Sequence, residues 1–111
     1  MRHAEVYRDS FALAVCHSAN LESPTIVGAQ AANELLNITG VKASIVFTYF
    51  NNEVYLSARS IDEVNVQLIM EKLGGGGHMT IAGAQLKDVT VDEAIELVKK
   101  TLDGMIEEGE I

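Results

Sequence analysis

Apolar positions along this chain alternate between two spacings, which predicts strands interleaved with helices. Residues 11–16 (FALAVC) form a short continuous apolar run, typical of a strand that is covered on both faces. Residues 25–36 repeat apolar positions at helical spacing, and Gly40 follows as a plausible stop. Residues 41–50 are rich in β-branched and aromatic side chains, so we predict a second strand there.

A hairpin is expected directly after this second strand. Asn51-Asn52 can adopt positive φ in a tight turn, and residues 53–59 then form the return strand. Successive side chains of a strand point to opposite faces of the sheet. The apolar set is Val54, Leu56 and Ala58. The polar set is Tyr55, Ser57 and Arg59.

Two later segments, residues 60–63 (SIDE) and 90–93 (TVDE), fit the capping box that opens a helix. The first predicts a helix from near Ser60 to Leu73, and residues 83–89 suit a further strand. The second predicts a final helix with one apolar stripe. The stripe comprises Val91, Ala94, Ile95, Val98, Leu102, Met105 and Ile106.

These elements predict an α/β (α+β) fold in the order β-α-β-β-α-β-α. We expect a mixed sheet of four to five strands with helices packed on it, and a right-handed crossover that joins the first two strands in parallel. The length of 111 residues suits one domain. We assign residues 11–111 to that domain and residues 1–10 to a linker or an edge strand from an upstream part.

Composition and charge restrict the functions that this chain can have. Cys16 is the single cysteine, so no internal disulfide can form, and no stretch approaches the ~20 apolar residues of a membrane span. We therefore predict a cytoplasmic location. The net charge is −8, and residues 87–111 hold eight acidic and three basic residues. No basic stripe is available to hold a long nucleic acid, so a phosphate ligand must be short and held locally.

Four consecutive glycines, Gly74, Gly75, Gly76 and Gly77, followed by His78, are the strongest local signal. One glycine is enough to end a helix, and each further one costs about 0.5–1 kcal/mol of conformational entropy. One hypothesis is a phosphate site, in which bare N–H groups and a following helix N-terminus approach an anion and His78 adds a donor. The other hypothesis is a flexible connector between two helices.

Other polar residues near this run have both a binding and a structural interpretation. Arg59 suits bidentate phosphate recognition, or it is an exposed arginine at a strand end. Asn65 and Thr80 are candidates to cap helices or to support the site. The sequence contains no His-x-x-x-His, no second cysteine and no Gly-x-Ser-x-Gly. We therefore predict no catalytic residue and no metal ligand, and we expect the isolated chain to be inactive.

Four motifs in fixed order resemble the C-terminal DHH-associated domain (DHHA type 1) of DHH-family phosphodiesterases. They are residues 57–60 (SARS), 63–67 (EVNVQ), 70–73 (MEKL) and 74–78 (GGGGH). Residues 65–85, with residues 4–9, are most similar to the GdpP/YybT-type cyclic-di-AMP phosphodiesterases. One departure concerns the substrate, because 78–80 (HMT) resembles the cyclic-dinucleotide enzymes whereas 82–84 (AGA) resembles the oligonucleotide-cleaving branch.

The resemblance implies a substrate-binding domain separated from its catalytic DHH domain. The parent would hydrolyse cyclic-di-AMP to pApA with two manganese ions held in the DHH domain, and this chain would need no cofactor. Arg59 and Gly74–Gly77 with His78 would bind the substrate phosphate, supported by Ser60, Asn65 and Thr80. The implied partners are a cyclic dinucleotide or a short 5′-phosphorylated oligonucleotide and the upstream DHH domain.

The resemblance also implies a membrane-anchored parent whose anchor lies outside this chain, and it leaves a homodimer of the parent open. Two alternatives stay open. One is the substrate-binding domain of a nanoRNase or single-strand exonuclease, and the other is a non-catalytic regulatory or scaffold domain.

Overall fold

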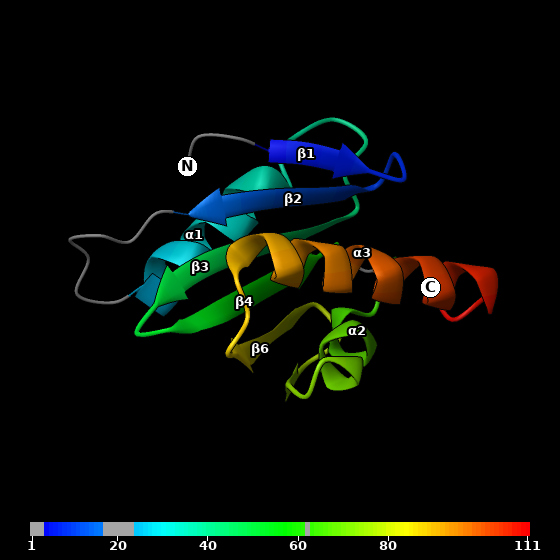
Figure 1. The fold of residues 1–111 in the computed structure, drawn as a ribbon. Helices are drawn as coiled ribbons and strands as arrows, with labels where there is room; N and C mark the ends of the chain where they lie inside the picture. The colour runs from blue at the N-terminus through cyan, green and yellow to red at the C-terminus, as the bar shows by residue number, and fades with distance from the viewer. Residues whose placement is uncertain (1–3, 17–23, 62) are drawn as a thin grey trace.

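The structure, a computed structural model, describes residues 4–16, 24–61 and 63–111 and contains one sheet with helices on both faces (Figure 1). The elements in chain order are β1 (Ala4–Tyr7), β2 (Phe11–Cys16), α1 (Pro24–Leu35), β3 (Ala43–Phe50), β4 (Glu53–Ser60), α2 (Val66–Lys72), β5 (Gly76–Gly77), β6 (Ile81–Lys87) and α3 (Val91–Glu107). Helix α1 covers one face of the sheet, and α2 and α3 cover the other.

The sheet is mixed, as predicted, with the strand order β1-β2-β3-β4-β6-β5. Strands β2 and β3 are parallel and are joined through α1, while the other neighbouring pairs are antiparallel. The predicted count of four to five strands was wrong, because the described residues form six. The uncounted strands are short pieces at the edges of the sheet, and β5 consists of two glycines that carry no alternating pattern.

The alternation predicted for the return strand is confirmed. Val54, Leu56 and Ala58 are buried in the larger core, which lies between the sheet and helices α2 and α3. The smaller core lies under α1 and is built mainly from alanines of β2 and α1. The hairpin turn is confirmed as well, since Asn51 and Asn52 have φ values of 53° and 63°.

Helix α3 begins at the predicted capping box. The Thr90 hydroxyl accepts a hydrogen bond from the Glu93 amide at 3.0 Å, and the Glu93 carboxylate accepts one from the Thr90 amide at 2.8 Å. The predicted apolar stripe packs against the larger core along the length of the helix. The predicted start of the helix and its predicted apolar stripe are therefore both confirmed.

The capping box predicted at residues 60–63 was wrong. Helix α2 begins at Val66, and its N-cap is Asn65, whose side-chain oxygen accepts a hydrogen bond from the Leu68 amide at 3.3 Å. Ser60 cannot cap a helix because it belongs to β4 and its buried hydroxyl donates to the Val64 carbonyl at 2.6 Å. Asp62, in the middle of that motif, lies outside the described residues.

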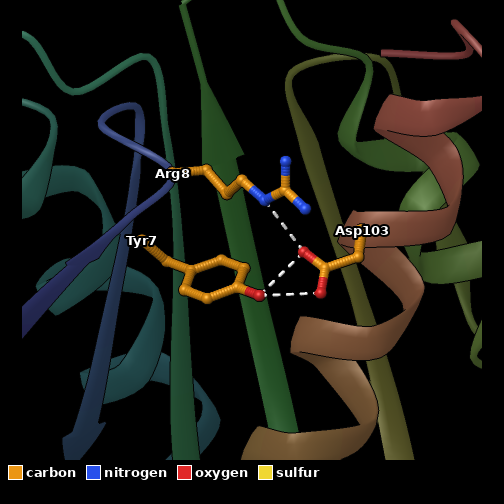
Figure 2. A network of polar contacts seen from close by, with 3 residues as sticks. All are labelled: Tyr7, Arg8 and Asp103. Atoms are coloured by element: carbon orange, nitrogen blue, oxygen red, sulfur yellow. Dashed lines mark hydrogen bonds and ion pairs between the residues drawn. The ribbon is translucent and has the colours of Figure 1, made fainter.

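A polar cluster fastens the edge strand β1 to α3 (Figure 2). The Tyr7 hydroxyl donates to the Asp103 carboxylate at 2.7 Å, and Arg8 Nε lies 3.0 Å from the same group. One helical turn away, Lys99 Nζ is 2.9 Å from the Glu5 carboxylate and 5.3 Å from the centre of the Tyr7 ring. These contacts join β1, at the edge of the sheet, to α3, which packs on the face opposite to α1.

Candidate functional site

Helix α1 leaves one end of its face of the sheet uncovered, and a hollow of about 670 Å³ lies there. Its floor is formed by β4 and β6, its rim by residues 74–78, and Ala29 of α1 closes another side. This volume is within the range of small-molecule sites, roughly 300–1,000 Å³. The hollow therefore brings together the two strongest predicted features, the glycine run and Arg59.

The glycine run begins by ending helix α2. Gly74 has φ +87°, and its amide donates to the Glu71 carbonyl at 3.1 Å. The Gly75 amide donates to the Met70 carbonyl at 2.8 Å, which completes a Schellman motif. The first glycine thus has a purely structural explanation.

Two further glycines allow β5 to lie against β6. A Cβ on Gly75 would lie 2.1 Å from the Gly83 carbonyl oxygen. A Cβ on Gly77, where φ is +143°, would lie 2.5 Å from the Ala82 Cα. The hypothesis of a flexible connector between two helices is therefore wrong, because Gly76 and Gly77 pair with β6 and the element that follows the run is that strand. The predicted helix dipole after the run is wrong for the same reason.

Gly76 is the glycine of this run that the fold does not explain. A Cβ there would meet no atom within 4 Å, and its φ is not positive. Its backbone lines the hollow. A glycine that neither a turn nor a close internal contact requires is suited to the close approach of a ligand.

Arg59 lies on the floor of the hollow in a partly desolvated position. Burial lowers the pKa of its guanidinium, and its Nη1 donates to the Ala58 carbonyl at 2.8 Å. Ion pairs within the described ranges use other cations. They are Arg8, Lys42, Lys72 and Lys99. Among the same residues, no carboxylate is paired with Arg59.

The charge of the hollow is opposite to that of the chain. Arg59, Lys87 and His78 line it, and none of the described lining residues is acidic, although the chain carries a net charge of −8. This arrangement favours an anionic ligand. It also disfavours a divalent cation, whose protein ligands are mainly carboxylates and carbonyls.

The three predicted supporting residues do not line the hollow. Ser60 is buried, and its backbone amide donates to the Thr80 carbonyl at 3.0 Å. Its hydroxyl also lies 3.4 Å from the Met79 carbonyl. Asn65 caps α2, and the helix predicted after Thr80 is wrong because β6 begins at Ile81. The contacts of Ser60 with the Met79 and Thr80 carbonyls hold the chain that leads away from His78.

Sequence reasoning missed four polar residues of the hollow, which are Ser57, Tyr55, Gln85 and Lys87. Tyr55 and Ser57 share the polar face of β4 with Arg59, so the alternation could have identified them. The residues of β6 could not have been found in this way, because their place depends on the β4–β6 register. In that register Tyr55 lies opposite Gln85, and Ser57 lies opposite Gly83.

A close contact under α1 sets one wall of the hollow. A Cβ on Gly28 would lie 2.9 Å from Thr48 Oγ1 and 3.1 Å from Ser57 Oγ. The missing side chain lets α1 sit directly on β3 and β4, and Ala29 then reaches the hollow. The position of the helix and the width of the site are therefore linked.

The described ranges contain no group of three or more His, Cys, Asp or Glu side chains that could hold a metal ion. The manganese ions implied by the resemblance have no suitable ligands among these residues, so we derive no step through them. None of the helices in the same ranges is both long and apolar enough to cross a bilayer.

Comparison with known proteins gives matches over most of the chain. A family model described as the DHHA1 domain matches residues 12–108. The cyclic-di-AMP phosphodiesterase PdeA of Listeria monocytogenes is 46% identical over 101 residues, which are 90% of this chain and 15% of that protein. The cyclic-di-AMP phosphodiesterase GdpP of Bacillus subtilis is 40% identical over 111 residues, which are 98% of this chain and 17% of that protein.

A solved structure shares the fold. The exopolyphosphatase-related protein from Bacteroides fragilis superposes with a TM-score of 0.76 at 21% identity, over 92% of this chain and 31% of that one. The chain thus spans 15% and 17% of the two curated relatives and less than a third of this structure.

Proposed function

This chain belongs to the DHHA1 domain family, and on that premise we propose that its hollow binds the phosphate of a nucleotide for a cyclic-di-AMP phosphodiesterase. The family predicted from the four motifs is confirmed. The observation that carries the proposal is the reversal of charge, since an acidic chain forms a hollow lined by Arg59, Lys87 and His78 and by none of its described carboxylates. A phosphate ester is the ligand class that this lining suits best.

Each part of the lining has a separate task in this proposal. The Arg59 guanidinium donates two parallel hydrogen bonds to phosphate oxygens, and its partial burial strengthens them. Gly76 lets the backbone approach the anion closely. His78, exposed at the rim, adds a third donor. The chain binds and orients the phosphate and performs no bond cleavage itself.

The parent's reaction is the hydrolysis of cyclic-di-AMP to pApA. Its metal site belongs to a part of the parent outside these residues, and manganese would supply the activation of the attacking water there. The relatives named as cyclic-di-AMP phosphodiesterases support this reaction. By the same proposal the parent hydrolase, with its DHH domain, is the partner of this chain.

The segment that resembles the oligonucleotide-cleaving branch does not favour that alternative. Ala82 and Ala84 face the larger core with exposures of 6% and 9%, so they contribute to packing under α2. Gly83 alone of the three faces the same side as Ser57. All three residues also border the hollow, so the Ala-Gly-Ala pattern bears on how β6 packs and on the shape of the floor, and it does not by itself select an oligonucleotide.

A titration of the 111-residue chain with pApA, with ApA as the ligand that lacks the 5′-phosphate, tests the proposal. We expect pApA to bind with a Kd near millimolar, about −4 kcal/mol, and to shift the amide signals of Arg59 and Gly76. Arg59→Ala should lose about 1–3 kcal/mol of binding free energy, as expected for a charge-assisted hydrogen bond. His78→Ala should weaken binding without unfolding the domain.

Lys100→Ala is the matched control, because Lys100 is also a cation without an ion pair among the described residues and lies on α3, on the other face of the sheet. Equal affinity for pApA and ApA, or equal losses in Arg59→Ala and Lys100→Ala, would contradict a phosphate site. Unfolding of His78→Ala would show that this side chain is structural.

A further inference from the structure

The hollow has a second end whose chemistry differs from that of the phosphate end. Tyr55 lies four residues before Arg59 on the same face of β4, about 13 Å away along the strand. Gln85 lies directly opposite Tyr55 in the β4–β6 register. Directly opposed residues have Cβ atoms about 5 Å apart, so the ring and the amide are neighbours on the floor.

Contacts within the protein do not explain this pair. Tyr55 is half-buried and Gln85 is exposed, and both line the hollow. Within the described ranges, neither the Tyr55 hydroxyl nor the Gln85 amide makes a hydrogen bond. By contrast, the Gln67 amide donates to the Glu71 carboxylate at 3.1 Å. An aromatic face beside an unused amide is therefore open to a ligand at this end.

We propose that Tyr55 and Gln85 form a nucleobase subsite that prefers adenine, an inference that rests on the phosphate-binding function proposed above. An aromatic side chain provides a platform for any base, because every base has a π-face. The glutamine amide adds selection, since its NH₂ donates to N7 of adenine and its oxygen accepts from the N6 amino group. Guanine presents acceptors at both N7 and O6, so the amide oxygen would face O6 without a partner.

The test compares pApA and pGpG on the 111-residue chain by titration. We expect pApA to bind at least about fivefold more tightly, the lower limit for one bidentate base contact. Gln85→Arg should reverse the order, because arginine donates to both O6 and N7 of guanine. Gln67→Arg is the matched control, because it makes the same exchange on α2, outside the lining of the hollow, and should leave the order unchanged.

Variants of the tyrosine test the platform independently. Tyr55→Leu should weaken pApA binding at least about fivefold, and Tyr55→Phe should retain it because the ring remains. Tyr49→Leu is the control, since Tyr49 lies opposite Val54 in the hairpin register and thus on the other face of the sheet. Because Gln85 is exposed, Gln85→Arg should not disturb folding. It therefore tests the subsite even where a tyrosine variant folds poorly.

Ribose 5-phosphate, which has a phosphate and no base, separates failure of the subsite from failure of the phosphate site. Equal affinity for pApA, pGpG and ribose 5-phosphate, with all three weakened by Arg59→Ala, would overturn the base subsite and leave the phosphate site standing. Absence of binding by all three would overturn both. Preference for pApA that is reversed by Gln85→Arg would establish the subsite.

Discussion

Two adjacent glycines, Gly75 immediately before β5 and Gly76 within it, offer a sharp test of which residues serve the fold and which serve the ligand. Alanine at Gly75 places a Cβ 2.1 Å from the Gly83 carbonyl oxygen and 2.6 Å from the Ala84 Cβ, whereas ordinary contact begins at 3.4 Å. Alanine at Gly76 places a Cβ where no atom lies within 4 Å. The same chemical change should therefore have opposite consequences at two consecutive positions.

The expected magnitudes follow from these contacts. In Gly75→Ala the obstructing atoms include backbone, so β5 must separate from β6, and we expect a loss of about 3 kcal/mol or a fall in Tm of roughly 10 °C. In Gly76→Ala the backbone conformation suits alanine. Its free energy of unfolding should be unchanged or higher by up to about 1 kcal/mol, because alanine restricts the unfolded chain.

Thermal unfolding followed by circular dichroism measures stability, and titration with pApA measures the site. We expect Gly76→Ala to keep its Tm and to lose most of its affinity, because the new methyl group stands between backbone and phosphate. If Gly76→Ala binds pApA as tightly as the unmodified chain, the reasoning that this glycine admits a ligand is refuted. If Gly75→Ala keeps its Tm, the packing of β5 on β6 is wrong.

Two other predictions concern the elements around the hollow. Gly28→Ala should lower stability by about 1–2 kcal/mol despite its better helix propensity, because the new Cβ would lie 2.9 Å from Thr48 Oγ1. Adding Thr48→Ala should restore most of this lost stability, because the Thr48 hydroxyl has no hydrogen-bond partner among the described residues. Denaturant unfolding measures the effect, and a double variant no more stable than Gly28→Ala would contradict the prediction. The hydrogen bond to Asp103 raises the pKa of Tyr7, so its stabilising effect is complete below the unfolded value of about 10 and is lost as pH rises through the higher folded value. Tm measured from pH 8 to 12 should fall less in Tyr7→Phe, and parallel curves for the two proteins would refute this.

Elements with a strong local pattern could be predicted from the sequence. The hairpin around Asn51-Asn52 combines alternation with a turn that needs positive φ, and the second capping box satisfies both of its hydrogen bonds. A local sequence pattern gave a wrong prediction where the same side chain makes a tertiary contact instead. Ser60 fits a capping box, but its hydroxyl bonds the Val64 carbonyl at the end of β4.

The candidate site could be predicted only in part. Arg59 and the glycine run could be identified from the sequence, because a guanidinium suits phosphate and repeated glycines cost conformational entropy. Both line the hollow. Gln85 and Lys87 give no such signal. They reach the site because β6 pairs with β4 in one particular register, which depends on α2 packing on Ala82 and Ala84.

The alternation along β4 interleaves two different tasks within one short strand. Val54, Leu56 and Ala58 hold the core, while the residues between them form the floor of the hollow. Substitutions at the half-buried Tyr55 and Arg59 can therefore change recognition with little effect on the core, whereas Ser57 is buried beneath α1 and serves packing as well. Inserting one residue in β4 would move the core side chains to the hollow and the floor side chains to the core. The length of this strand is therefore more tightly constrained than its individual residues.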